Sequence, residues 1–193
     1  MRTRLLPYRG SHGAPTLNDS QLAALFERAK EERVLQTVMY SDDTGRWTSR
    51  HLIAFFRSEA RAIWLVYFDR KLAGWVWLDD FGHRTARIHF CFFRWLSRER
   101  LTVQAGRELL WILLNTGFRN GVRLEVIRGE TPSFNKLALR FIEKVGLKIV
   151  GEVPSAAYRH EDGVAHSMVY SYVNREILRE RLDGGIVPTL ASR

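Results

Sequence analysis

Three side chains are of types that could accept or donate a proton in catalysis: His89, Glu125 and Tyr158. An imidazole changes charge near neutral pH and a carboxylate accepts protons, so His89 or Glu125 could act as a general base. A tyrosine hydroxyl such as that of Tyr158 or Tyr170 could donate a proton. Each has a structural alternative, because a lone histidine on an aromatic strand is more often structural and tyrosines near sheet ends usually pack. These residues alone nominate acid–base candidates without choosing among them.

The elements that must position these side chains follow from the hydrophobic pattern. Gly74, inside an expected strand, indicates a bulge or a close backbone approach. The strand that ends at Ile127 is reached through a helix, so we expect it to lie parallel to the strand before it. Residues 1–16 indicate a loop or a short strand. We expect helices over 22–33, 49–56, 101–118 and 174–182, and strands over 63–68, 72–78, 85–94, 122–127, 147–153 and 166–173.

The segment Thr131–Val150 carries the most specific pattern in the chain. Its apolar residues recur at the three-and-four spacing of a helix with one apolar face. Gly146 stands where that helix must end, because glycine adopts the left-handed conformation at little cost. Leu147 can then fold back on Ile142, and a strand follows at once.

This segment resembles the last helix and following strand of the GCN5-related N-acetyltransferase (GNAT) superfamily. The residues that carry the resemblance are Asn135, Ala138 three positions later, and the run Glu143–Leu147. The order of expected elements is similar to that superfamily from about Leu17 to Val173. The resemblance implies an α/β (α+β) acyltransferase fold, a mixed and mostly antiparallel sheet with helices on both faces.

Length and composition limit the kinds of protein that this chain could be. The 193 residues, 46% of them hydrophobic, predict one folded domain over 1–182 followed by a flexible tail over 183–193. Apolar runs are too short to span a bilayer. Cys91 is the single cysteine, which excludes an internal disulfide and a Cys-rich zinc site and predicts a cytoplasmic protein. The formal charge of +9 favours anionic partners, but no nucleic-acid motif accompanies it.

The resemblance also implies where a cosubstrate would bind. The acyl carrier of acetyl-CoA would lie between the third and fourth strands of the meander, against backbone groups of Cys91, Phe92 and Phe93. Its pyrophosphate would meet the start of the following helix, where free N–H groups favour an anion. There Gly106 matches the last glycine of the superfamily's phosphate-loop motif, but Gln104 and Leu101 replace its other two residues.

Four further residues belong to this expected site. Arg100 and Thr102 could supply charge and a hydroxyl to the phosphates. Asn135 matches an asparagine that helps to hold the cofactor in the superfamily, or it simply caps its helix. A tyrosine that protonates the leaving thiolate in many relatives is replaced here by Ile142.

The resemblance therefore predicts an N-acetyltransferase that moves an acetyl group from acetyl-CoA directly to a primary amine. The alternative is a catalytically silent copy of the fold that acts as a binding or regulatory module, which the missing glycine and tyrosine favour. We expect an unidentified amine acceptor, no metal and no membrane association, and a homodimer is one assembly open to the chain.

Overall fold

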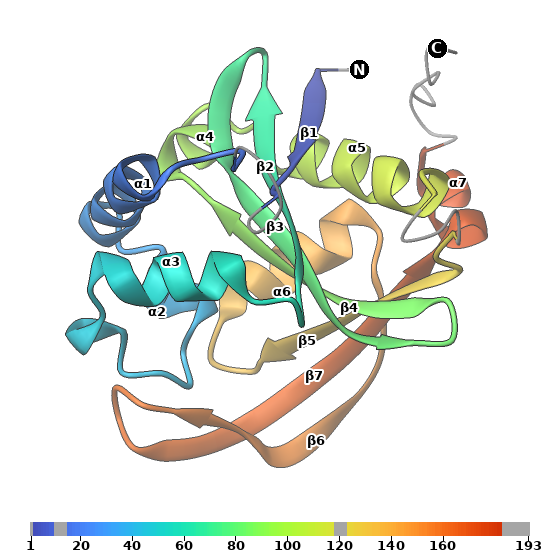
Figure 1. Ribbon diagram of the computed structural model, residues 1–193. Coiled ribbons are helices and arrows are strands. Elements are labelled where there is room, and N and C mark those ends of the chain that lie inside the picture. Colours follow the sequence, from blue (N-terminus) through green and yellow to red (C-terminus); the bar gives the residue numbers. More distant parts are fainter. Residues whose placement is uncertain (1, 10–14, 118–122, 183–193) are drawn as a thin grey trace.

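The computed structural model describes residues 2–9, 15–117 and 123–182, and these form one seven-stranded sheet with helices on both faces (Figure 1). The strand order is β1-β2-β3-β4-β5-β7-β6. The strands are β1 (Thr3–Pro7), β2 (Ala62–Phe68), β3 (Lys71–Gly82), β4 (Thr85–Phe92), β5 (Val126–Pro132), β6 (Lys148–Arg159) and β7 (Val164–Asn174). Among the described residues, all neighbouring strands pair antiparallel except β4 with β5, which are parallel. The predicted fold class and the parallel pairing are confirmed.

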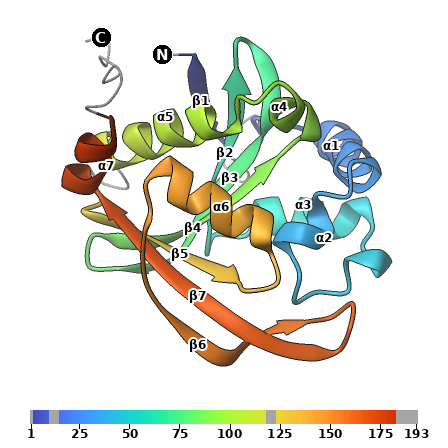
Figure 2. The same cartoon turned by 180° about the vertical axis from the view of Figure 1, so that it is seen from behind.

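Helices from two parts of the chain cover the two faces (Figures 1 and 2). One face packs against α1 (Asp19–Glu31), α2 (Leu35–Val38) and α3 (Ser49–Arg57), and a 3₁₀ turn, η1 (Thr44–Arg46), joins the last two. The other face packs against α5 (Thr102–Asn115), α6 (Lys136–Val145) and α7 (Arg175–Leu182). Alternate residues of β3 divide between the two cores, with Trp75 and Trp77 under the first group and Val76 and Leu78 under the second.

Gly74 lies where the backbones of β3 and β4 come close. Its φ is +143°, and a Cβ built on it would lie 1.9 Å from the carbonyl oxygen of Cys91. The pairing of β2 with β3 also shifts register beside it, between Val66 and Tyr67. The close approach and the bulge predicted at this glycine are confirmed.

The segment after β5 folds as its pattern predicts. Asn135 caps α6, and Gly146 ends the helix in the left-handed conformation with φ +109°. The N–H of Leu147 then donates to the carbonyl of Ile142 at 2.9 Å, and both side chains are buried in the same core. This strong local signal explains why the prediction was accurate here.

Several expected boundaries were wrong, and β3 and β6 run further than expected, to Gly82 and Arg159. The strand expected at 122–127 is β5, which begins at Val126 and continues to Pro132. The helix expected at 101–118 is α5, and a short helix, α4 (Arg94–Arg98), precedes it where the strand before was expected to continue. Residues 118, 122 and the predicted tail 183–193 lie outside the described residues.

Candidate active site

The cavity at the centre of the molecule arises because β4 and β5 separate. The two strands pair only at Thr85 to Arg87 with Val126 to Arg128, and beyond that point they diverge. The gap forms a cavity of about 780 Å³, whose walls are the later residues of β4 and β5, the segment around α2, and the facing sides of α5 and α6. A parallel pair that is joined at one end only leaves backbone groups along the gap without a strand partner.

The β4 wall uses alternate residues. The N–H of Phe93 donates to Ala73 at 2.8 Å, and the carbonyl of Cys91 lies against Gly74, so both residues direct their backbone groups to β3. Because strand residues alternate, the backbone groups of Phe90 and Phe92 are directed toward the gap. Phe90 and Phe92 also line the cavity with their side chains.

The backbone groups of Cys91 and Phe93 therefore face β3, and not the gap where the cosubstrate was expected. Their side chains are buried under α1 and α3, and neither residue is among those that line the cavity. Burial raises the pKa of the Cys91 thiol well above its ordinary value, which keeps it in the unreactive protonated form. Phe92 remains a candidate, and Phe90 joins it.

His89 lines the cavity from β4 and is held on two sides. Its ring stacks on Trp77 with the centroids 4.5 Å apart and the planes 5° from parallel. Its Nε2 lies 3.2 Å from Oδ1 of Asp79 on β3. A carboxylate at that distance favours the tautomer in which Nε2 carries the proton, which leaves Nδ1 as the basic nitrogen.

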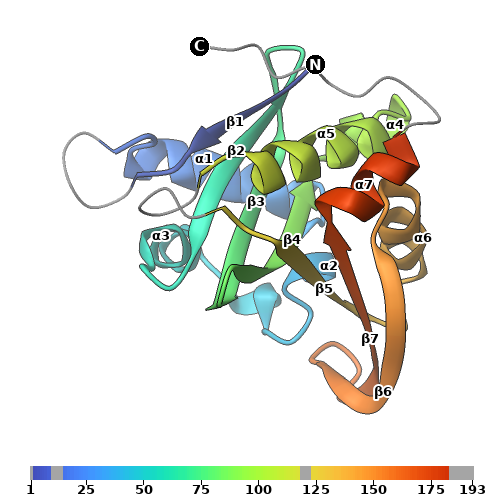
Figure 3. The ribbon, with the colours of Figure 1, turned by 90° about the vertical axis from the view of Figure 1, so that its right-hand side faces the viewer.

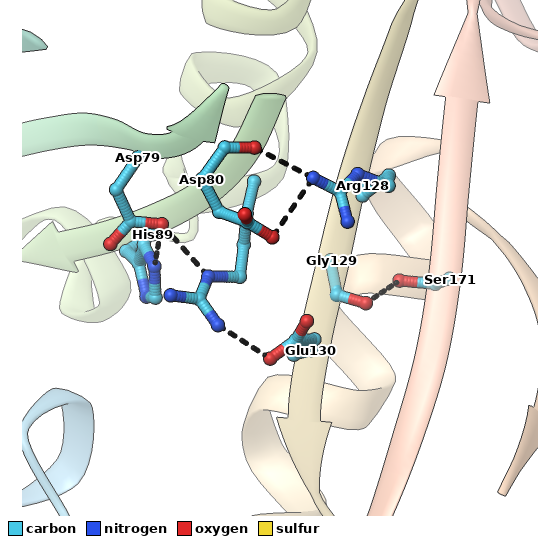
Figure 4. A network of polar contacts seen from close by, with 8 residues as sticks. Asp79, Asp80, His89, Arg128, Gly129, Glu130 and Ser171 are labelled. Atoms are coloured by element: carbon cyan, nitrogen blue, oxygen red, sulfur yellow. Dashed lines mark hydrogen bonds and ion pairs between the residues drawn. The ribbon is translucent and has the colours of Figure 1, made fainter. Parts of the chain in front are cut away.

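An ion-pair network, shown in Figure 4, joins three strands at the point where β4 and β5 separate. Arg87 on β4 donates from Nε to Asp79 at 2.8 Å and from Nη1 to Glu130 on β5 at 2.7 Å. The bond to Asp79 raises the pKa of Arg87, against the opposing effect of burial. Burial alone would raise the pKa of Asp79, but the hydrogen bonds from His89 and Arg87 outweigh it and hold that pKa well below its ordinary value.

The tyrosine that lines the cavity is Tyr40, which follows α2. Burial raises its pKa to about 12, with the charge of Glu130 adding to the shift and that of Arg87 opposing it. Its ring meets Phe134 edge-on with centroids 5.7 Å apart, and its carbonyl accepts from the N–H of His160 at 3.0 Å. Tyr40 therefore keeps its proton at neutral pH and can act as a donor.

The opposite end of the cavity is cationic. Thr102 begins α5 and donates from its hydroxyl to Ser97 at 3.3 Å, and both residues line the cavity. Arg94, Arg140 and Lys144 line it too, and they outnumber the carboxylate beside them, Glu32, which accepts from the N–H of Arg94. Leu101, the residue before α5, makes no side-chain cap, so the first N–H groups of this 14-residue helix are left for an anion. Arg100 is not among the lining residues.

Gly106 serves helix packing. It lies one turn inside α5, where a Cβ would come within 2.7 Å of Val145 and 2.8 Å of Phe141 on α6. The structure places α6, and not the cavity, directly in front of this glycine.

Asn135 lines the cavity, and its Oδ1 accepts from the N–H of Ala138 at 3.1 Å. This bond is the helix cap that the sequence left as one of two possibilities. A ligand in the cavity could use only the remaining Nδ2 amide as a donor.

Glu125 and Tyr158, the other two acid–base candidates, lie outside the cavity lining. Glu125 precedes β5, at the closed end of the β4–β5 pair, and forms an exposed ion pair with Arg84. Tyr158 is 52% exposed on β6. The structure supplies Glu130 and Tyr40 instead. Glu130 was missed because Gly129 and Pro132 disfavour a strand, which hid the continuation of β5.

Ile142, at the position where the resemblance implies a tyrosine, is buried and lines the cavity, and its side chain has no proton to donate. Within 2–9, 15–117 and 123–182, no group of three His, Cys, Asp or Glu side chains could hold a metal ion. No helix in those same ranges is long and apolar enough to cross a membrane.

Comparison with known proteins gives matches among solved structures. No protein-family model matches the chain, and no curated protein matches its sequence. The spermidine N-acetyltransferase from Vibrio cholerae, solved with CoA and spermine, has a TM-score of 0.69 and 14% identity over 92% of this chain and 98% of that one. A probable GNAT-family acetyltransferase from Chromobacterium violaceum has a TM-score of 0.68 and 16% identity over 93% and 86%.

A third similar structure is RimL, a ribosomal L7/L12 α-N-protein acetyltransferase in complex with coenzyme A. It has a TM-score of 0.65 and 12% identity over 88% of this chain and 98% of that one. These similarities cover nearly the whole of both chains at low identity. The chain therefore has the fold of the GCN5-related N-acetyltransferases.

Proposed function

We propose that the chain is an N-acetyltransferase that transfers an acetyl group from acetyl-CoA directly to a primary amine. The observation that carries the proposal is the gap between β4 and β5, with a candidate base at one end and cations at the other. The similar structures support it at the level of fold, because those named above are acetyltransferases and two were solved with CoA. The single, buried Cys91 is consistent with a reducing compartment, so the cytoplasm remains the proposed location.

The residues present fit an acyl-CoA. Backbone groups of Phe90 and Phe92 along the gap would pair with the amides of the pantetheine arm, as an added strand would. The start of α5, the hydroxyls of Ser97 and Thr102, and the cations Arg140 and Lys144 would hold its phosphates. Acetyl-CoA supplies the thioester carbonyl that an amine attacks.

The other end of the cavity would handle the amine. The Glu130 carboxylate would attract an ammonium group, since it lines the cavity while it accepts from Arg87 through Oε2. His89 would remove the amine proton at Nδ1, because Asp79 occupies Nε2. Tyr40, which stays protonated at neutral pH, is the candidate donor for the leaving group.

Two measurements on the full chain test the proposal. Acetyl-CoA should raise the melting temperature by mass action, and thiol release should follow when a primary amine is added. Absence of any shift at millimolar acetyl-CoA would refute both cosubstrate binding and catalysis. Binding without thiol release across a panel of amines would favour the silent binding module, which the buried Ile142 at the usual tyrosine position also favours.

The role of His89 has a matched control in His166. Both histidines lie 3.2 Å from a carboxylate through Nε2, but His166 pairs with Asp162 and does not line the cavity. His89→Gln should lower kcat by about 100-fold or more and change the pH dependence of kcat. His166→Gln should change neither. An unchanged pH profile in His89→Gln would remove it as the base.

A further inference from the structure

The outer strand β6 has no packing face along most of its length. Every residue from Lys148 to Ala156 is exposed, although β6 is part of the sheet. It is the last strand in the order and pairs with β7 alone, and Figure 3 shows it along the outer edge of the molecule. A strand that is exposed on both faces buries little of its own apolar surface.

The exposed residues of this strand are unusually apolar. Ile149, Val150 and Val153 are 40%, 63% and 47% exposed. Long edge strands with apolar side chains promote pairing with another chain, and proteins normally protect them with charges or a cover. None of these three side chains belongs to either hydrophobic core of the described residues.

The charge pattern of the strand favours a second copy of this chain as the partner that pairs with β6. Lys148 and Glu152 lie two residues on either side of Val150, and neither forms an ion pair with a described residue. If two copies of the strand pair antiparallel about Val150, Lys148 of each copy faces Glu152 of the other. The ladder with β7 also skips Val150, the residue at the centre of this arrangement.

We propose that the chain forms a twofold dimer through antiparallel pairing of β6 with β6 of a second copy, centred on Val150. The pairing ends at Val153, because Pro154 has no N–H and Ser155 has φ +55°. Two copies related by a twofold axis use up this edge, so the pairing stops at a dimer. A strand this short buries a small interface, and we expect a dissociation constant in the micromolar range.

The dimer would also brace one wall of the cavity. The β6–β7 hairpin reaches the Tyr40 loop through the bond from His160 to the Tyr40 carbonyl, and Arg159 lies 4.9 Å over the ring of Phe134. Phe134 in turn contacts the Tyr40 ring. Pairing at β6 therefore restrains the hairpin that supports a candidate donor.

Charge exchange tests the register. Sedimentation velocity on the full chain should show a monomer–dimer equilibrium at micromolar concentration. Lys148→Glu places four acidic groups along the pairing and should weaken association at least tenfold, as should Glu152→Lys with four basic ones. The double variant Lys148→Glu/Glu152→Lys should restore it. Failure of the double variant to recover the dimer would overturn the antiparallel register.

A second test changes Val150, the residue at the proposed twofold axis. Val150→Lys places two like charges beside each other at the twofold axis and should give a monomer. The control is Val164→Lys, which also places a lysine at an exposed valine but on the neighbouring strand β7, outside the proposed pairing. Val164 is as exposed as Val153, and this variant should stay dimeric. Melting temperatures of all variants report folding. A wild-type chain that stays monomeric at its highest soluble concentration, or a dimer that survives Val150→Lys, would overturn the proposal, whatever the outcome for acetyl transfer.

Discussion

The two ends of the cavity balance their charges differently. Where β4 and β5 separate, Arg87 is enclosed by Asp79 and Glu130, and His89 completes the network (Figure 4). At the other end, Arg140 and Lys144 of α6 line the cavity, and neither forms an ion pair with an acidic side chain of the described residues.

This difference suits the two ends to different tasks, the first to orienting a proton-transfer group and the second to attracting an anion. Paired charges fix the geometry of their members, as a proton-transfer group requires. Unpaired cations attract an anion and leave it free to depart. Changes at the first end should therefore alter stability and pH dependence, and changes at the second end should alter binding and its salt dependence.

Arg87→Met should have the largest effect on stability. It leaves the Asp79 and Glu130 carboxylates without their cation in a partly buried site, with Arg87 29% exposed at its side chain. We expect the free energy of unfolding to fall by about 3 kcal/mol, at the low end for a broken buried pair. Urea unfolding at neutral pH measures it.

The control for this change is Arg84→Met, which breaks an ion pair with Glu125 that is about half exposed on both sides. Exposed pairs contribute roughly 0 to 1 kcal/mol, so its loss should be small. Equal losses of unfolding free energy in the two variants would show that the network around Arg87 stabilises the fold no more than an exposed ion pair does.

Asp79→Asn should change how stability depends on pH. The folded protein holds the pKa of Asp79 below its ordinary value, so the ionised form stabilises the fold. That contribution is present above about pH 4, the range in which the unfolded carboxyl is ionised, and is lost as the pH falls toward the folded value. The wild type should lose stability from about pH 5 downward more steeply than Asp79→Asn.

The same variant should slow catalysis, since His89 loses the carboxylate that fixes its tautomer. We expect kcat to fall by about tenfold or more with little change in the affinity for acetyl-CoA. Asp80→Asn is the neighbouring control, because Asp80 pairs with Arg128 in an exposed site. Equal rates in wild type and Asp79→Asn would show that His89 works without this orientation.

Lys144→Gln should weaken acetyl-CoA binding by about fivefold at low salt, because one charge near a phosphate is worth about 1 kcal/mol. The difference should shrink as salt screens it. Lys136→Gln removes a lysine from the same helix that does not line the cavity, and should leave binding unchanged. Titration calorimetry at two salt concentrations decides between these outcomes.

The sequence predicted the fold better than the site, for physical reasons. Local signals decide an element such as α6, where a capping Asn135 and a left-handed Gly146 mark both ends. The element order and the parallel β4–β5 pair follow from similar patterns. A site depends instead on register, and β5 was placed about four residues too early, so Glu125 was chosen where Glu130 lines the cavity.

Tyr40 shows a second limit. It lies in the irregular segment after a four-residue helix, and only tertiary packing brings it toward Glu130. No periodicity marks such a position in the sequence. His89 could be identified because its strand was assigned correctly, with the imidazole on the same face as Arg87.

Gly106→Ala should have the smallest effect and distinguishes packing from cosubstrate contact. The new methyl group would meet Val145 at 2.7 Å and Phe141 at 2.8 Å. Overpacking of this kind costs about 1–3 kcal/mol, and replacing glycine in a helix returns up to about 1 kcal/mol, so a net loss of about 1 kcal/mol is expected. Unfolding in urea measures the loss.

Val145→Ala in the same chain provides the decisive comparison. It removes the methyl groups that the Gly106→Ala side chain would strike, so the double variant should lose less stability than the sum of the two single variants. Acetyl-CoA affinity should be the same in all of them, because α6 stands between Gly106 and the cavity. If the losses of stability were additive and acetyl-CoA bound more weakly, Gly106 would instead contribute to phosphate binding.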